Sequence, residues 1–555
     1  MAKTSKPEGL ALLQHDLAAG HIDRREFVRF ATLIGVTAAS AFAMAGLPHP
    51  ARAQTALPKG GSIRVGTRCF EIASPHKWQN PVRSNVGRQV FDYLTRTGHD
   101  NVTRPSLLEK WEATPDLKTW TLSLRRDVRW HNGQPLTIDH VLWNLERLLD
   151  PATGSAILSQ LRPLLLNQVD TGEKDDKGNP RRKDVLWDAQ AIQRVDDFTL
   201  RLSLKVPSVT IPELLFNYQF VILHPDDKGE FKPGALGTGA FTLVADEVGR
   251  RQVVRAVQRP YFGGGPYLDQ IEFIDVGDDP ATQMAALLSG QIDGLHRGGV
   301  TMLEPMKASA RHQIHEVDSA ECGVARMKPV KPFDDPRVRL AMRLAIDPRA
   351  VSALALRSAG APGEHHHVGR GMPDYAELPF MERDVPRARR LLAEAGYPNG
   401  FETEIHGIPQ VDWHPNAIQA MVEQWKEIGV RCKISIVPSA MYWENWKKYP
   451  FGFTLWAHRS PGIVTPSLAY RSGGAWNESD YANPEFDRLL VEAEGILDAA
   501  KRKETMAKLQ RILLEDGPIV LPTFVRLFTY TDRRWMGFAM HPSTYAFGHE
   551  WALRS

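Results

Sequence analysis

The sequence has few cysteines and no excess of either charge. Its 555 residues include three cysteines, Cys69, Cys322 and Cys432, too few and too scattered for a disulfide framework or a zinc ribbon. Lys and Arg number 68 against 65 Asp and Glu, which gives a formal net charge of +3 at pH 7. This near balance gives no general reason to expect binding to nucleic acid or to a membrane surface. If an oxidising compartment allows one disulfide, we expect it between Cys322 and Cys432, which both lie in strand-like runs.

The sequence also lacks the common catalytic motifs. It contains no GxSxG, no HExxH and no CxxC pattern, and the dipeptide Gly-Lys is absent. The last absence excludes a Walker phosphate-binding loop, so any ATPase must be a separate subunit. We therefore predict that the protein is not an enzyme and needs no cofactor. A hydrolase is the alternative from the enzyme class, and it would need a nucleophile, a base and an orienting group that the sequence does not bring together.

Residues 1–53 read as an export signal. The segment DRREFVR at 23–29 resembles the twin-arginine export motif, and an uncharged run rich in Ala, Gly and Thr extends from Phe30 to Leu47. Ala51 to Ala53 then supplies small residues for cleavage. A membrane anchor is the alternative, because the uncharged run approaches the roughly 20 residues that span a bilayer. The run is only weakly apolar and a cleavage site follows it, so we predict a periplasmic protein exported through the twin-arginine route.

About 500 residues remain after the signal, too many for one hydrophobic core, so at least two lobes are expected. The segment 401–437 shows the chain organisation best: alternating apolar residues, then apolar residues at helical spacing, then alternation again. This pattern predicts a strand, a helix and a strand, and hence an α/β lobe. Met421 and Trp425 follow the helical spacing and are expected in the core. Residues 171–183, which are charged and lack apolar periodicity, are expected to form a surface loop.

The segment Pro105 to Pro151, PSLLEKWEATPDLKTWTLSLRRDVRWHNGQPLTIDHVLWNLERLLDP, resembles the signature of the bacterial extracellular solute-binding proteins of family 5. These are the receptors of peptide, nickel and opine ABC importers. Further segments resemble the same family in the same order, and together they extend from about Gly60 to Phe528: VFDYLT, GTGAF, LLSGQIDG, PFDDPRVRLAMRLAID, ARRLLAEAGYPNGFE, WKEIGVRCKISIVP, NPEFDRLLVEA and PIVLPTF.

The resemblance implies an α/β fold, that of a two-lobed periplasmic binding protein (type II, cluster C) with an extra subdomain in the first lobe. Its boundaries, carried onto this chain after the signal at 1–53, place lobe I at 54–98, 208–315 and 524–555, the extra subdomain at 99–207 and lobe II at 316–523. Two chain crossings would form a hinge, and the lobes would close over a ligand in the cleft. The protein is expected to act as a monomer.

The resemblance also implies the function. The protein would capture a small organic solute of the peptide or opine class and deliver it to a cognate ABC permease, which an ATPase subunit drives. A receptor for a metal chelate, nickel or haem, is the alternative within the same family.

The expected ligand site lies after Trp456. In the peptide-binding branches of the family, a Trp in the second lobe is closely followed by an Asp that pairs with the free ammonium group of the peptide. Here the run reads LWAHRSPG, and no Asp follows until Asp480. His458 or Arg459 occupies the neighbourhood of that Asp. A buried cation facing an ammonium group would cost several kcal/mol, whereas a guanidinium suits a carboxylate, phosphate or sulfonate. We therefore expect an anionic or modified solute.

Further candidates surround this run. Trp78 and Arg83 follow the first strand, in a loop that resembles one that contacts ligand in the nickel-complex branch, although an aromatic residue there could equally close the rim of the lobe. Trp443 and Trp446 belong to a segment dense in aromatic residues, which would suit varied side chains or rings. His366 and His367, in the run EHHHVG, would lie at the cleft mouth. Neutral imidazoles bind Ni, Cu or Zn well, but adjacent loop residues seldom converge on one ion, so we expect local hydrogen bonds and no metal site.

Overall fold

A computed structural model describes two units of the chain, residues 1–58 and 59–555. The described residues are 13, 15–20, 22, 27, 57–78, 81–155, 157–174, 180–357, 359–408, 413–474 and 476–554. The expected twin-arginine motif, uncharged run and cleavage site lie outside them, apart from Phe27. Across these described ranges, no helix combines the length and the apolar character needed to cross a membrane.

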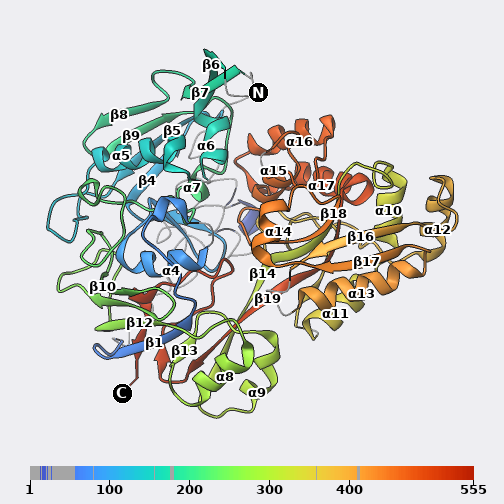
Figure 1. Ribbon diagram of the computed structural model, residues 1–555. Coiled ribbons are helices and arrows are strands. Elements are labelled where there is room, and N and C mark those ends of the chain that lie inside the picture. Colours follow the sequence, from blue (N-terminus) through green and yellow to red (C-terminus); the bar gives the residue numbers. More distant parts are fainter. Residues whose placement is uncertain are drawn as a thin grey trace. The chain divides into compact units, whose positions relative to one another are not determined.

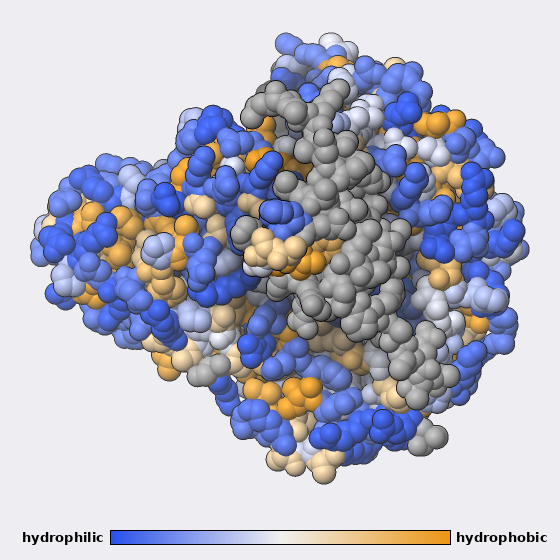
Figure 2. All heavy atoms as spheres, turned by 180° about the vertical axis from the view of Figure 1, so that it is seen from behind, coloured by the Kyte–Doolittle hydropathy of each residue, from blue (hydrophilic) through white to orange (hydrophobic). Residues whose placement is uncertain are grey.

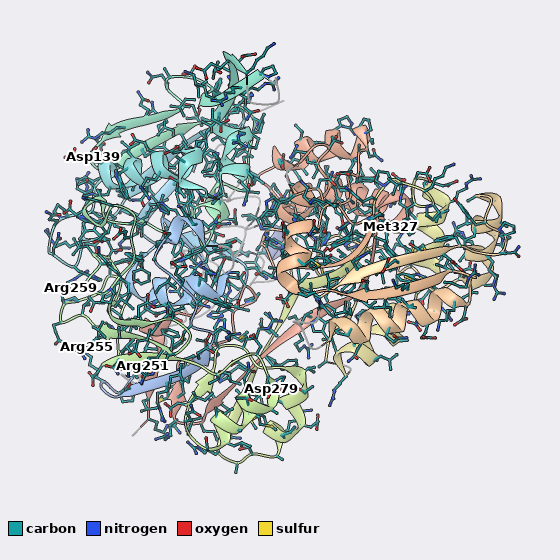
Figure 3. All side chains as sticks on the ribbon, in the orientation of Figure 1. Asp139, Arg251, Arg255, Arg259, Asp279 and Met327 are labelled. Carbon is teal, nitrogen blue, oxygen red and sulfur yellow. The ribbon has the colours of Figure 1, made fainter. Side chains whose placement is uncertain are left out.

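The first lobe is built around one half of a long mixed sheet. Its strands are β1 (Ser62–Thr67), β10 (Phe241–Glu247), β11 (Arg251–Ala256), β12 (Gln270–Asp275) and β13 (Gly294–Leu295). They follow the order β10-β11-β12-β1-β13, with β1 parallel to both β12 and β13. Figure 3 marks two positions of β11, Arg251 and Arg255. The α-helices described in this lobe are α4 (Pro81–Val90), α7 (Ile211–Leu214), α8 (Pro280–Leu288) and α9 (Leu303–Lys307).

Two long strands connect the lobes. β14 (His312–Met327) and β19 (Ile519–Asp532) pair antiparallel, from His312 opposite Asp532 to Arg326 opposite Ile519. The register shifts between Asp318 and Cys322, and beyond this irregularity β14 also pairs with β18 (Phe451–Trp456) of the second lobe. Figure 1 shows β14 and β19 running between the two groups of strands. The sheet is therefore continuous through both lobes, and the shift lies where the chain crosses from one to the other.

The second lobe contains the strand, helix and strand that the sequence predicts. These are β16 (Glu402–Gly407), α13 (His414–Lys426) and β17 (Arg431–Ile436), with the two strands parallel. Met421 and Trp425 of α13 are both 0% exposed, which confirms their place in the core. The sheet order continues as β14-β18-β16-β17. The other helices of this lobe are α10 (Pro336–Leu344), α11 (Pro348–Leu356), α12 (Val385–Glu394), α14 (Ser439–Asn445), α15 (Val464–Tyr470), α16 (Pro484–Glu494) and α17 (Ala499–Asp516).

The prediction of a disulfide between Cys322 and Cys432 is wrong. Cys322 lies in β14 and Cys432 lies in β17, and β18 and β16 separate these strands in the sheet. Neighbouring strands are about 4.8 Å apart, so the two sulfur atoms are too far apart to bond. All three cysteines are free thiols.

The extra subdomain forms a separate sheet of four strands. These are β4 (Leu108–Ala113), β5 (Thr119–Leu124), β8 (Ile192–Asp196) and β9 (Thr199–Ser203), in the order β4-β5-β9-β8. The helices α5 (Ile138–Leu149), which carries Asp139 in Figure 3, and α6 (Leu158–Leu165) accompany it. The prediction of a loop at 171–183 needs correction, because 171–174 and 180–183 belong to the paired strands β6 (Leu166–Lys174) and β7 (Pro180–Leu186). Both strands are mostly exposed there, which explains why no apolar alternation marks them.

Apolar side chains gather in the interior, and hydrophilic residues cover most of the surface shown in Figure 2. Buried apolar side chains form separate clusters in the first and second lobes, and a third cluster extends from the extra subdomain into the second lobe. On the face shown in Figure 2, the described residues are mostly hydrophilic and the hydrophobic ones lie between them in small groups. The strands β2 (Thr95–Thr97) and β3 (Thr103–Pro105) form an antiparallel hairpin, which presents the turn 98–102. The short strands β20 (Trp535–Met536) and β21 (Ala552–Leu553) also pair, and β15 (Ala361–Pro362) pairs with β19.

Candidate ligand-binding site

Trp456 ends strand β18 and is held by a buried network. Its indole Nε1 donates a 2.7 Å hydrogen bond to Oε1 of Glu478, and Trp456 is 3% exposed. The other oxygen of Glu478 accepts from Nε of Arg326 at 3.1 Å and from the Thr454 hydroxyl at 2.7 Å. The charge of Glu478 is thus balanced by that of Arg326 inside the lobe, and its hydrogen bond orients the indole of Trp456. The sequence reasoning overlooked this acid, since a separation of 22 residues gives no local signal of a contact with Trp456.

His458 connects strand β14 with the hairpin of β2 and β3. Its Nδ1 accepts from the backbone N–H of Ala320 at 3.0 Å, and its Nε2 lies 2.8 Å from Oδ1 of Asn101. The Ser460 hydroxyl donates to the Asn101 carbonyl at 3.2 Å. Burial lowers the pKa of His458 to about 3. The imidazole is therefore neutral, and it acts as a link between the second lobe and the turn 98–102.

Arg459 is the charged group of this run. Its Nη1 donates to the Ala457 carbonyl at 3.0 Å, and its guanidinium carbon lies 5.6 Å from the ring centroids of both Trp456 and Trp476. Burial lowers the pKa of the guanidinium, although the hydroxyls of nearby Tyr residues oppose this effect. Within the described part of the chain, no carboxylate forms an ion pair with Arg459. Arg459 is thus a half-buried cation that contacts two tryptophan rings and has no described counter-ion.

The side chain of Arg459 lines a small cavity that several elements share. The cavity has a volume of about 80 Å³. The second lobe contributes the run 458–460 and Val464 of α15, while the first lobe contributes the segment around α7 and residues near the C-terminus. Its remaining lining is largely polar: Thr97, Gln160, Thr210, Glu213, Asn217, Ser543 and Tyr545, with Leu214 and Phe216. Polar groups from both lobes therefore converge where Arg459 stands.

A larger cavity adjoins this one. It measures about 640 Å³ and lies between the extra subdomain and the second lobe. The two cavities have Gln160, Thr210, Leu214 and Val464 in common. Its two lining arginines are paired, Arg162 with Asp184 at 2.7 Å and Arg471 with Glu494 at 2.6 Å. Its lysine, Lys205, donates a 2.7 Å hydrogen bond to the side-chain carbonyl of Asn167. Leucine, valine and tryptophan side chains provide much of the rest, so this space suits a largely apolar group.

A third cavity lies on the hinge side of the lobes. It measures about 630 Å³ and is lined by parts of β1, α8 and β19. Its arginines already have acidic partners: Arg68 bonds to Asp275 at 3.1 Å, Arg297 to Glu321 at 2.6 Å and Arg526 to Asp318 at 2.8 Å. Asp279, labelled in Figure 3, caps α8 through the backbone N–H of Thr282. Because these arginines already form ion pairs, this cavity is a weaker candidate for a charged solute than the cavity at Arg459.

Trp78 and Arg83 do not line the cavity at Arg459. Trp78 is 1% exposed in the core of the first lobe, where its Nε1 donates to the Ile72 carbonyl at 3.2 Å and its ring packs against Phe231. Arg83 lies on α4, donates to the Glu71 carbonyl at 3.1 Å and stands 5.3 Å from the ring of Phe70. Both contacts favour a role in the packing of the first lobe, and we leave these two residues out of the proposed site.

Trp443 and Trp446 lie at helix α14, apart from Trp456. Trp443 is 42% exposed, and its ring centroid is 6.1 Å from that of Trp446. The backbone carbonyl of Trp446 accepts from the guanidinium of Arg326. Neither tryptophan lines the cavity at Arg459 or the one beside it, so a contact with ligand at these positions stays a prediction.

The three histidines at 365–367 are buried and turn to three different partners. His365 Nδ1 accepts from the backbone N–H of Leu521 at 3.1 Å, His366 Nε2 lies 3.1 Å from Nε2 of Gln510, and His367 Nδ1 lies 2.7 Å from the Tyr470 hydroxyl. Burial lowers the pKa of His365 and of His367 to about 3. Among the described residues, no group of three or more His, Cys, Asp or Glu could hold a metal ion. His367 does reach the site indirectly, because its ring lies 5.1 Å from that of Trp456.

The continuous sheet and the polar cavity between two lobes define a two-lobed binding protein. The family described as "Bacterial extracellular solute-binding proteins, family 5 Middle" matches residues 103–480. The chain therefore belongs to this family, whose members are not enzymes. It is the periplasmic type of substrate-binding component that serves an ABC importer.

Individual relatives agree with this assignment. The chain is 24% identical over 487 residues to the periplasmic oligopeptide-binding protein OppA of Haemophilus influenzae, covering 83% of this chain and 86% of that protein. It is 25% identical over 490 residues to heme-binding protein A of the same species, covering 82% and 86%. Among solved structures, AgaA of A. tumefaciens R10 in complex with agropinic acid superposes with a TM-score of 0.74 at 22% identity, covering 89% of this chain and 99% of that one. The structural likeness shows the fold.

Proposed function

We propose that this receptor binds a small anionic organic solute of the opine or modified peptide class, and that Arg459 anchors its anionic group. Arg459 carries the proposal because it is a half-buried cation that no described carboxylate pairs with, at a cavity that both lobes line. A guanidinium binds a carboxylate through two parallel hydrogen bonds. An anion at this position would offset the desolvation that now lowers the pKa of Arg459.

The remaining contacts assign roles to the neighbours of Arg459. Trp456, fixed by Glu478, supports the guanidinium from one side. His458 and Ser460 contact Asn101 of the turn 98–102, so they join the two lobes next to the ligand. Closure of the lobes would then bury the solute and present a closed surface to the permease. The signal at residues 1–53 would deliver the folded receptor to the periplasm through the twin-arginine route.

The test is thermal stability and calorimetry of the protein purified without its signal. The panel contains free peptides, amine-blocked peptides, N-(1-carboxyethyl) amino acids and metal chelates. A compound present at 100 times its Kd adds about 2.7 kcal/mol of stability, which corresponds to a rise in Tm of about 2–3 °C for a protein of this size. We expect the anionic compounds to raise the Tm.

Two variants connect such binding to the site. Arg459→Ala should weaken the anionic compounds at least tenfold, a loss of about 1.4 kcal/mol or more. Arg431→Ala is the matched control, because Arg431 is a surface arginine of the same lobe with a side chain 62% exposed. An unchanged Kd in Arg459→Ala would refute the role of Arg459. If only the free peptides stabilise the protein, its ligand is an ordinary peptide and the proposal of an anionic solute is wrong.

A further inference from the structure

Glu213 lines the same cavity as Arg459. It belongs to the short helix α7 of the first lobe, whereas Arg459 belongs to the second lobe. Glu213 is partly buried, and burial is the main reason why its pKa rises to about 7, while the Thr103 hydroxyl acts in the opposite direction. The cavity thus has an acid on one lobe and a base on the other.

No cation of the described residues compensates Glu213. The nearby Arg502 influences its pKa, but this guanidinium is 3.2 Å from Oδ2 of Asp374, and both side chains are buried. Asp374 is also engaged by the backbone N–H groups of Gly462 and Ile463, at 2.6 and 3.2 Å. Arg502 and Asp374 therefore form an ion pair with each other, and Arg502 makes no ion pair with Glu213.

We propose that Glu213 binds a cationic nitrogen of the solute, so that the cargo is a zwitterion held by Arg459 at its anionic group and by Glu213 at its amine. This inference rests on the proposed function and narrows its substrate class to amino-acid derivatives that keep a basic amine. It also replaces the missing Asp of the peptide-binding branches with an acid from the opposite lobe. A solute that bridges Glu213 and Arg459 would favour the closed arrangement of the lobes, because it can contact both residues at once only when the lobes meet.

The adjoining cavity of about 640 Å³, which is lined in large part by apolar side chains, accommodates the rest of such a molecule. It shares four lining residues with the cavity at Glu213, and its arginines are paired. Charged groups would therefore bind in the small cavity and an apolar or aromatic group would occupy the large one. N-(1-carboxyethyl)phenylalanine has this composition, with a secondary amine, two carboxylates and a phenyl ring.

The experiment compares this compound with its ether analogue, in which oxygen replaces the amine nitrogen. The two have nearly the same shape, but only the amine carries a positive charge near neutral pH. Calorimetry at pH 8 gives both Kd values for the wild-type protein and for Glu213→Gln. We expect the wild type to bind the amine at least tenfold more tightly than the ether. In Glu213→Gln this preference should disappear, while the Kd of the ether changes less than twofold.

Controls separate this inference from the proposed function. Glu230→Gln changes an exposed acid of the first lobe, with a side chain 60% exposed, and should preserve the tenfold preference. Arg459→Ala should weaken the amine and the ether alike. If Arg459→Ala has this effect but Glu213→Gln keeps the preference, Glu213 is not the amine anchor and the proposed function stands. If neither compound binds the wild type, or Arg459→Ala changes neither Kd, both proposals fall.

The pH dependence provides a second readout. Glu213 ionises as the pH rises through about 7, so the affinity for the amine should rise over this range and that for the ether should not. The other titratable and charged groups near the cavity are Arg459, His458, Tyr218, Tyr545 and the pair of Arg502 with Asp374. His458, with a pKa of about 3, stays neutral here. An amine affinity that is flat from pH 6 to 8 would contradict the assignment.

Discussion

Glu213 should destabilise the ligand-free protein, and the cost can be worked out from its surroundings. Its pKa rises from an ordinary 4.5 to about 7 because burial disfavours the carboxylate. Each pKa unit corresponds to about 1.4 kcal/mol, so the full shift corresponds to about 3 kcal/mol. Partial exposure of the side chain reduces this figure through solvent screening, and we expect about 2 kcal/mol.

The sign follows from proton linkage. Between pH 4.5 and about 7, the folded protein holds the proton of Glu213 more tightly than the unfolded chain does. Stability therefore falls as the pH rises through this window, and the loss is complete above it. Glu213→Gln removes the titration. Relative to wild type, this variant should gain about 2 kcal/mol of unfolding free energy between pH 4.5 and pH 8, as expected for a site that sacrifices stability for function.

Urea unfolding of both proteins at pH 4.5 and at pH 8 measures this difference. Titration of the buried histidines affects wild type and variant alike, so it cancels in the comparison. Glu230→Gln, the exposed control, should show no such pH-dependent gain. If the free-energy difference between Glu213→Gln and wild type is the same at both pH values, burial does not hold the pKa of Glu213 high, and the reasoning fails.

Two further predictions concern the support of Trp456 and the export route. Arg326→Met should lower the unfolding free energy by about 3–5 kcal/mol, because it leaves Glu478 buried without its ionic partner at 3.1 Å. A loss under about 1 kcal/mol in urea unfolding would show that the pair is not needed. Replacement of both Arg24 and Arg25 by Lys should leave the precursor in the cytoplasm when cell fractions are compared by immunoblotting, and normal appearance of the mature protein in the periplasm would exclude the twin-arginine route.

The sequence predicted those elements whose pattern is local. Alternation and helical spacing within 401–437 are set by neighbouring side chains that share one face, and β16, α13 and β17 follow them. The predicted loop at 171–183 was wrong for the complementary reason. Strands β6 and β7 bury little apolar surface there and are paired through their backbones, so no side-chain pattern records them.

The candidate site was predictable in part. Arg459 could be singled out from the sequence because its position in the run after Trp456 is defined by the order of neighbouring residues. The structure then shows that Arg459 lines a cavity and has no acidic partner among the described residues. Trp78 was named on the same kind of argument, but the structure places it in the core. Position along a motif does not tell which way a side chain points, because that depends on what the rest of the lobe packs against it.

The sequence by itself determined the family, the two-lobed α/β architecture and the absence of catalytic motifs, since these depend on local patterns and on their order along the chain. The tertiary structure alone decided which charges are compensated. Glu478 reaches Arg326 across 152 positions, whereas Glu213 and Arg459, 246 positions apart, line one cavity without a described ionic partner. Whether a charge is neutralised or free to bind a solute depends on distances of a few ångströms, and folding sets those distances.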